Sequence, residues 1–417
     1  MQLRYNFRLY PTASQREALA RAFGCARTVY NDGLRMRQEA REAGLPYIKD
    51  ADLQRQVLTE AKHNPDRAWL AEVSYVVLGQ AVNDLNGAYR RFFASLQGRS
   101  KQRNVGPPRF KSRKTGRQTI RFTRNAFRLR PDGHLNLAKV GDVPVRWSRR
   151  LPSTPSSVTV IKDGAGRYFA SFVVRTDPAE VLPEVSGEVG IDLGLTHFAV
   201  LSDGRKVSSP KFFRRAERRI RKAQQALSRK EKGSNNRQKA VQRVARLHAR
   251  VTDARRDHHH KLSTQIIREN QAVYVENLSV KGLARTRLAK SIHDAGWSTF
   301  VTMLEYKATR YGRTFAKVDR WLPSSQTCHV CMVIDGPKPL NVRTWICGAC
   351  NTEHDRDVNA ARVILAVGRA ERQNACRGTV RPAAQRKAGP GETGTQLVSV
   401  EQPLPQVGRQ KTSELPA

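Results

Sequence analysis

Two acidic segments with apolar neighbours limit the architectures open to this chain of 417 residues. In GIDLG, Asp192 lies between glycines on a run, Val189 to Leu195, whose alternate residues are apolar. A period of two predicts a strand, and the glycines leave room around the carboxylate. In YVENL, Glu276 closes the apolar run that starts at Ala272. Both acids are expected at strand positions, with Glu276 at the strand end where α/β sheets place ligands.

A third acidic segment, HDRDVNAA, precedes an apolar-periodic run from Val358 to Leu365. This pattern predicts a helix, with Asp355 or Asp357 at its N-terminus. Acids from three distant segments indicate a hard-cation site, in which carboxylates hold Mg²⁺ for attack on a phosphodiester. The alternatives are a turn role for Asp192, a surface role for Glu276, and helix capping by one of the two aspartates.

The charge of the chain indicates a polyanionic partner. Lys and Arg number 75 against 36 Asp and Glu, giving a formal net charge of +39 and a pI near 10.9. Basic side chains bound to phosphates release counterions, so nucleic acid is the expected partner. No apolar run approaches the roughly 18 residues of a membrane-spanning helix, and MQLRYNFRLY lacks a signal-peptide core. We therefore expect a cytoplasmic protein with no membrane partner and no small-molecule substrate.

Two CxxC pairs predict a structural zinc site. Fifteen residues separate the pairs, and the four ligands are Cys328, Cys331, Cys347 and Cys350. Paired thiolates from two knuckles suit tetrahedral Zn²⁺, and six cysteines in so long a chain are too few for a disulfide scaffold. The other two, Cys25 and Cys376, are expected to be inert.

The first 187 residues read as a strand, a helical block and a set of short strands. Residues 1–11 alternate apolar and polar residues, and residues 12–93 have helical spacing. The basic segment Gly98–Arg117 is either a solvated loop or a phosphate-contacting arm. Short strand patterns between 118 and 175 indicate a small antiparallel barrel or sandwich, which the first strand would complete. A linker is expected over Thr176–Gly187.

The segment Lys211–His260 is expected to form a basic helical hairpin. It carries 17 Lys and Arg against 4 Asp and Glu, hence 17 − 4 = +13, and KGSNN interrupts it. His258 to His260 are interpreted as helix-surface and interface residues rather than metal ligands. From Arg372 onward the chain loses periodicity, so Arg372–Ala417 is predicted to be a disordered tail.

Together, several motifs resemble the TnpB family of transposon-encoded RNA-guided nucleases, which is related to the type V CRISPR (Cas12) effectors. The motifs are LYPTASQ, FGCARTVYN, GPPRFKSRK, the three acidic segments, and PSSQTCHVC with its zinc ribbon. The likeness covers roughly residues 5 to 365. One departure is Met332, which follows the second cysteine of CHVC where the family commonly has Gly.

The resemblance implies a multidomain fold of α/β and β parts. Its domains would be a β-barrel wedge (1–11 and 94–183), a helical recognition domain (12–93), an RNase H-like (RuvC) nuclease domain (184–320 and 351–371), a zinc ribbon (321–350) and the tail (372–417). Mg²⁺ would lie at Asp192, Glu276 and Asp357, because the family match places the third acid two residues before NAA. Asp355 would then be the cap or a neighbouring group. Arg343 matches a basic position that lies near the scissile phosphate in the family.

The resemblance also implies the partners and the reaction. They are a guide RNA, a double-stranded DNA target with a short adjacent motif, and metal-dependent hydrolysis of both strands. The residues themselves indicate only a two-metal site that activates water, and basic surfaces that hold a duplex by its backbone. The nucleic-acid-binding candidates are Arg109, Lys111, Arg214, Arg218, Arg221 and Arg243.

Two other functions were weighed. A strand-transferring transposase is disfavoured because the acids run Asp, Glu, Asp, and because HHH lacks the apolar spacer of a His-hydrophobic-His motif. A catalytically weak or non-cleaving RNA-guided regulator is disfavoured because all three acidic segments are intact. An RNA-guided, Mg²⁺-dependent endodeoxyribonuclease associated with a transposon is therefore the expected function.

Overall fold

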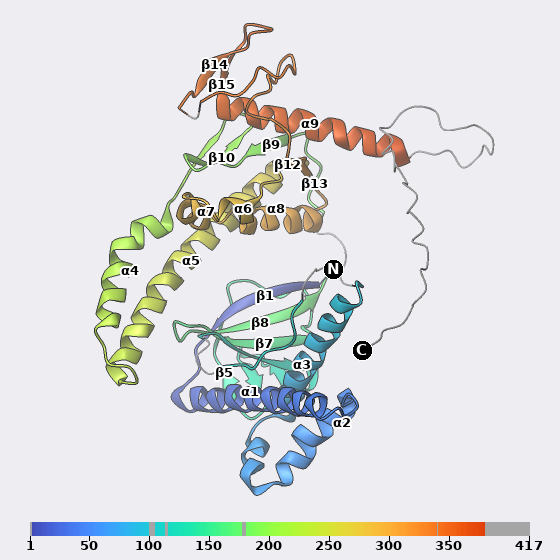
Figure 1. Ribbon diagram of the computed structural model, residues 1–417, viewed down its shortest axis with the longest axis vertical. Coiled ribbons are helices and arrows are strands. Elements are labelled where there is room, and N and C mark those ends of the chain that lie inside the picture. The colour runs from blue at the N-terminus through green and yellow to red at the C-terminus, as the bar shows by residue number, and fades with distance from the viewer. Residues whose placement is uncertain (1, 100–104, 113–115, 177–180, 340, 380–417) are drawn as a thin grey trace, which may run out of the picture. The chain divides into compact units, whose positions relative to one another are not determined.

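The computed structural model describes residues 2–99, 105–112, 116–176, 181–339 and 341–379, which form two compact units (Figure 1). The first unit contains Met1–Gly187, Ser209–Gln271 and Val280–Phe315. The second contains Glu188–Ser208, Ala272–Ser279 and the chain from Ala316 onward. The expected nuclease domain, residues 184–320 and 351–371, thus contributes segments to both units. Parts of the expected basic arm and linker, and the expected tail from residue 380, lie outside the described residues.

The first unit is built on a five-stranded antiparallel sheet with the order β2-β7-β8-β1-β6. Its strands are β1 (Gln2–Leu9), β2 (Gln118–Thr123), β6 (Val145–Arg146), β7 (Ser157–Lys162) and β8 (Tyr168–Arg175). β1 alternates buried Tyr5, Phe7 and Leu9 with more exposed residues, and it pairs with β8 along its whole length. The expected N-terminal strand therefore lies inside this sheet, between β8 and β6.

A second, three-stranded sheet has the order β3-β4-β5 and comprises β3 (Phe127–Leu129), β4 (Leu135–Leu137) and β5 (Gly141–Val143). The two sheets share one apolar core, in which the rings of Phe127 and Phe172 lie 6.5 Å apart. The described strands form no closed barrel. Strands of three residues turn back at Gly133 and Gly141, both with positive φ, so they pair with one another and do not extend the larger sheet.

Helices pack against the larger sheet of the first unit (Figure 1). α1 (Ala13–Glu42) begins at Thr12, whose side chain forms a capping box with Gln15. α3 (Tyr75–Leu96) packs beside α1. Between them lie α2 (Asp50–Gln54), a π-helical turn (Arg55–Glu60) and two 3₁₀ turns (Ala61–His63 and Pro65–Glu72). The second 3₁₀ turn is capped by Asn64, at the Asn-Pro interruption of the helical pattern.

The expected basic hairpin forms as α4 (Phe212–Ser228) and α5 (Asn235–Glu269), with Ser234 capping α5. Three helices follow in the same unit: α6 (Val280–Leu283), α7 (Ala289–Ala295) and α8 (Trp297–Tyr311). Buried Asp294 accepts hydrogen bonds from the first amides of α4 and pairs with Arg255 of α5. Arg167, in the β7–β8 turn, pairs with Asp253 of α5. These contacts explain why the hairpin belongs to the first unit.

The second unit contains most of a five-stranded sheet with the order β11-β10-β9-β12-β13. The strands are β9 (Glu188–Asp192), β10 (His197–Leu201), β11 (Lys206–Ser208), β12 (Ala272–Glu276) and β13 (Thr314–Val318). β9, β10 and β11 form an antiparallel meander, and β12 runs parallel to β9. A two-stranded ribbon of β14 (Thr344–Ile346) and β15 (Glu353–Asp355) leads into α9 (Arg356–Thr379).

α9 packs against β9 and β12 at a distance that only glycine permits (Figure 1). A Cβ atom on Gly190 of β9 would lie 2.1 Å from the carbonyl oxygen of Ala361. A Cβ atom on Gly368 of α9 would lie 2.2 Å from the Tyr274 ring of β12. Both contacts involve backbone or a buried ring, so neither can yield cheaply. The sheet and the helix are therefore held at a fixed close spacing.

The prediction that the tail starts at Arg372 is wrong for its first residues, because α9 continues to Thr379. Two arginines of this helix, Arg369 and Arg372, pair with Glu188 of β9 at 2.5 and 2.9 Å. Glu188 is distant in sequence, so local composition carried no sign of this support. None of the helices in the described ranges is both long and apolar enough to cross a membrane.

Candidate active site

Asp192 and Glu276 lie side by side at the ends of two parallel strands. The register pairs Ile191 of β9 with Val275 of β12, so the next residue on each strand is one of the two acids. Ile191 and Val275 are fully buried, which fixes the alternation that turns the acids toward the strand ends. Two carboxylates from segments over 80 positions apart are thus brought together by backbone pairing.

Electrostatics at this point of the sheet oppose ionisation. Burial, followed by the nearby carboxylates of Glu276 and Asp357, raises the pKa of Asp192 to about 7. Burial also raises the pKa of Glu276. Carboxylates gathered without a cation repel one another, and one of them then holds its proton to unusually high pH. A bound divalent cation would remove this penalty, so the donor set fits a hard metal ion such as Mg²⁺.

The two aspartates that precede α9 have different environments. Asp355 Oδ1 accepts hydrogen bonds from the amides of Asp357 and Val358, at 3.2 and 3.0 Å, so Asp355 caps the helix. Its Oδ2 is 2.5 Å from Lys206 Nζ. Partial burial acts in the opposite direction, but the Lys206 ammonium and the Val358 amide hold the pKa of Asp355 below its usual range.

Asp357 faces the other two acids, as its electrostatic effect on Asp192 shows. Arg343 Nη1 lies 3.4 Å from one carboxylate oxygen of Asp357, and Arg343 Nη2 lies 3.3 Å from Thr196 Oγ1. His197 Nδ1 lies 3.8 Å from the other oxygen. Sequence reasoning missed His197, which follows the GIDLG segment on β10 without any motif of its own.

The four predicted zinc ligands gather as expected. Their sulfur atoms lie within 4.8 Å of one another, and no other such group of three or more metal-ligating side chains occurs among the described residues. Cys328 and Cys350 are separated by 3.6 Å between sulfurs, and Cys331 and Cys347 by 3.7 Å. A tetrahedral ion with Zn–S bonds of about 2.3 Å needs sulfurs about 3.8 Å apart, so the cluster fits Zn²⁺.

The two knuckles have the same backbone hydrogen bonds. In each, the first cysteine's carbonyl accepts from the residue after the second cysteine, Met332 or Asn351, at 2.9 Å. In each, the amide of the first cysteine donates to the residue after that, at 3.0 Å. Met332 and Asn351 have φ of 59° and 55°. Met332 therefore adopts the left-handed conformation that glycine would take more easily.

Comparison with known proteins adds independent evidence on the family. Family matches cover residues 171–287 ("Probable transposase", OrfB of IS605 type), 297–364 ("Cas12f1-like, TNB domain") and 1–45 ("Helix-turn-helix domain"). A "Putative RNA-guided DNA endonuclease" of Streptomyces pristinaespiralis is 46% identical over 385 residues, covering 91% of this chain and 92% of the relative. The chain belongs to the TnpB family.

Two further likenesses accompany this one. "Putative RNA-guided DNA endonuclease InsQ" of Escherichia coli K12 is 28% identical to this TnpB-family chain, over 88% of the chain and 92% of the relative. Among solved structures, Cas12f1 in a complex with sgRNA and target DNA matches with a TM-score of 0.50, covering 87% of this chain and 98% of that one. At 13% identity, the second likeness concerns the fold alone.

The predicted nucleic-acid-binding side chains of this TnpB-family chain are exposed. They are Arg214, Arg218 and Arg221 of α4, Arg243 of α5, and Arg109 and Lys111 of the segment before β2. Asn31 hydrogen-bonds both the amide and the carbonyl of Lys111, and Lys111 Nζ lies 3.9 Å from the centre of the Tyr30 ring. The hydrogen bonds anchor this basic segment to α1.

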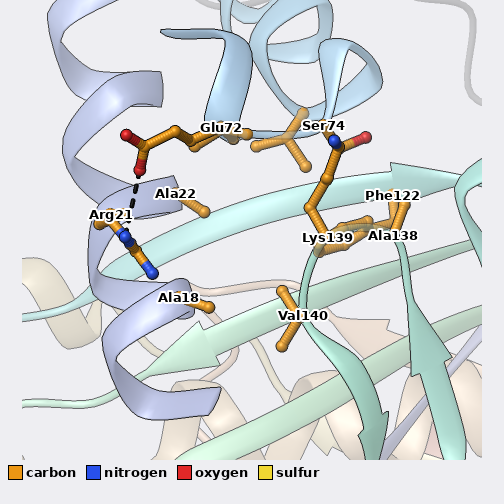
Figure 2. Close-up of a pocket in the computed structure, with 11 residues that line it drawn as sticks. Ala18, Arg21, Ala22, Glu72, Ser74, Phe122, Ala138, Lys139 and Val140 are labelled. Atoms are coloured by element: carbon orange, nitrogen blue, oxygen red, sulfur yellow. Dashed lines mark hydrogen bonds and ion pairs between the residues drawn. The ribbon is translucent and has the colours of Figure 1, made fainter. Parts of the chain in front are cut away.

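A cavity of about 260 Å³ lies in the first unit, between α1, the start of α3 and the strand β2 (Figure 2). Its walls include Ala22, Val77 and Phe122, and an ion pair between Arg21 and Glu72, at 3.1 Å, lies at one side. None of its lining residues is among the predicted catalytic residues. The acids and thiolates are instead presented by the second unit.

Proposed function

We propose that this protein is an RNA-guided DNA endonuclease that hydrolyses phosphodiester bonds at Asp192, Glu276 and Asp357. The observation that carries the proposal is the convergence of these carboxylates from two strand ends and a helix start. Its partners would be a guide RNA and a double-stranded DNA target with a short adjacent motif. The printed names of the relatives support guidance by RNA, and the net charge of +39 supports polyanion binding.

We assign the sheet of the second unit, with α9, to an RNase H-like nuclease fold of the RuvC type. An antiparallel meander followed by a parallel fourth strand supports this assignment. The β-rich part of the first unit would act as the wedge, residues 12–93 as the recognition domain, and residues 321–350 as the zinc ribbon. The basic hairpin α4–α5 would contact phosphates without reading bases.

The carboxylates would hold Mg²⁺, which when bound supplies Lewis-acid activation of water and stabilises charge on the phosphate. Asp192 and Glu276 provide oxygen ligands from rigid strands, and Asp357 closes the set from the helix. Arg343 lies within reach of Asp357 and carries a fixed positive charge, so it is suited to a phosphate oxygen beside the acids. The cysteines would hold Zn²⁺ as a structural ion.

The test compares Asp192→Asn and Asp357→Asn with the matched control Asp355→Asn. RNA that copurifies with the protein is sequenced, and duplex DNA matching its variable end, with randomised flanks, is supplied together with Mg²⁺. We expect the first two variants to lose at least about a hundredfold in cleavage rate, the scale of losing a key electrostatic group, while retaining DNA binding.

Asp355→Asn should keep cleavage, because Asn also caps helices and the exposed pair with Lys206 contributes about 1 kcal/mol or less. Cleavage by Asp192→Asn or Asp357→Asn at the wild-type rate would refute the site. An active Asp357→Asn beside an inactive Asp355→Asn would show that the third ligand is misassigned. Binding without any cleavage by the wild type would favour the non-cleaving regulator.

A further inference from the structure

The first zinc knuckle is joined to the first turn of α9 by one buried amide side chain. Asn359, which is 1% exposed, donates from Nδ2 to the carbonyl of Thr327 at 2.7 Å. Its Oδ1 accepts from the backbone amide of His329 at 3.0 Å. Thr327 and His329 are the two neighbours of the zinc ligand Cys328. Asn359 therefore grips the backbone on both sides of that ligand.

The ring of His329 extends the same connection. Asn359 Oδ1 is an acceptor, so His329 Nδ1, 3.0 Å away, is the nitrogen that carries the proton. The other ring nitrogen then accepts from Arg362 Nη1 at 3.2 Å. Arg362 also donates from Nε to the carbonyl of Ser202, in the turn between β10 and β11, at 3.3 Å. The knuckle is thereby connected through α9 to the sheet that carries Asp192.

A second residue connects the zinc ligand to the same helix start. His354, which is 3% exposed, has Nε2 3.1 Å from Cys328 Sγ and is suited to donate to the thiolate. It directly precedes Asp355, the helix cap. The ribbon residue Arg343 also accepts a backbone hydrogen bond from Arg356, at 2.8 Å. Three separate contacts thus hold the segment around Asp357 against the ribbon.

We propose that Asn359 is a positioning residue that couples the zinc ribbon to the acidic centre, fixing Asp357 relative to Asp192 and Glu276. This inference rests on the proposed function. Asn359 follows Asp357 by two residues in the same helical turn, so a shift of its backbone moves the carboxylate. The side chain uses both its donor and its acceptor, which neither Asp nor Ala reproduces. Groups that orient metal ligands in this way typically change metal affinity 10- to 100-fold when removed.

The sequence alone suggested a smaller role for this asparagine. Together with Ala360 and Ala361, it was expected only to keep the first turn of the helix small. The structure shows Ala360 and Ala361 buried as expected, but the Asn359 amide reaches across to the ribbon. An amide two residues after a candidate ligand, in a chain with a nearby CxxC pair, is the signal that would have pointed to it.

The test uses full-length Asn359→Ala and Asn359→Asp, with Asp192→Asn as the matched comparison. Zinc release to a chromogenic chelator reports on the ribbon, and Mn²⁺ binding followed by electron paramagnetic resonance reports on the acids. We expect both Asn359 variants to release zinc about tenfold faster and to bind Mn²⁺ about tenfold more weakly. Asp192→Asn should weaken Mn²⁺ binding and leave the zinc release rate unchanged.

Faster zinc release with unchanged Mn²⁺ affinity would show that Asn359 only stabilises the ribbon, and would overturn the coupling. Unchanged values for both metals would overturn it as well. If Asn359→Ala folds poorly by circular dichroism, the nearly isosteric Asn359→Asp decides, because it keeps an acceptor for His329 and loses only the donor to Thr327. Wild-type protein that binds no Mn²⁺ in an Asp192-dependent manner would instead refute the proposed active site, and the coupling with it.

Discussion

Replacing Met332 with glycine should strengthen the zinc ribbon. Met332 is the residue after the second cysteine of the first knuckle, and its φ is 59°. Its amide must remain there to donate to the carbonyl of Cys328 at 2.9 Å. The corresponding residue of the second knuckle, Asn351, has nearly the same φ of 55° and the same hydrogen bond, so Asn351→Gly is a matched control.

The expected gain is the difference between two backbone terms. A non-glycine residue in the left-handed region costs about 1–2 kcal/mol. Glycine returns about 0.4–1 kcal/mol of this, because the unfolded chain becomes more flexible. The Met332 side chain is 44% exposed, so its removal gives up little buried area. The net stabilisation of Met332→Gly should be roughly 0.5–1 kcal/mol, whereas Asn tolerates this conformation and Asn351→Gly should be close to neutral.

Zinc affinity is the appropriate measurement, because binding to a site that orders on metallation includes the folding free energy of the ribbon. Competition with a chelator should show Met332→Gly binding zinc about two- to fivefold more tightly than the wild type, the fold-change that corresponds to this energy. Asn351→Gly should lie within about twofold of the wild type. Weaker zinc binding by Met332→Gly, or an equal gain in Asn351→Gly, would refute the attribution to backbone strain.

Two further predictions follow from the first unit. Replacing Arg214, Arg218, Arg221 and Arg243 together with Ala should weaken nucleic-acid binding evenly across sequences and reduce the slope of log affinity against log salt by up to about 3; an unchanged slope would exclude these side chains from phosphate contact. Burial, with a smaller effect from His258, lowers the pKa of His259 to about 4, so the neutral form is favoured in the folded state. Its contribution to stability is therefore complete above about pH 6.5 and is lost as the pH falls toward 4. The loss of melting temperature between pH 7 and pH 4.5 should be smaller in His259→Phe than in the wild type, and an equal loss would contradict this assignment.

Features that depend on neighbouring residues could be predicted from the sequence. The Thr12 cap, the interruption at Asn64 and the two zinc knuckles each combine residues within a few positions of one another, and each forms as expected. The order of the acids along the chain also placed them at strands and at a helix start. Backbone pairing of β9 with β12 then brought Asp192 beside Glu276 without further information.

Features that depend on distant partners could not be predicted in this way. α9 continues past Arg372 because Glu188, on another strand, pairs with its arginines. The β-rich region leaves its sheets open because the three-residue strands turn back early, which alternation alone cannot reveal. Asn359 contributes through contacts with Thr327 and His329, about 30 positions away. In each case the deciding interaction joins segments whose proximity only the folded chain establishes.

The close packing of α9 on the sheet has a consequence for judging variants and relatives of this protein from an inventory of their ligands. Gly190 and Gly368 carry no chemistry, yet they set the separation between the strand that bears Asp192 and the helix that bears Asp357. A protein with alanine at either position would retain every carboxylate and every cysteine, but its acids would stand further apart. A full set of ligands in a sequence is therefore insufficient evidence of a working nuclease, and a silent descendant can arise without losing one of them.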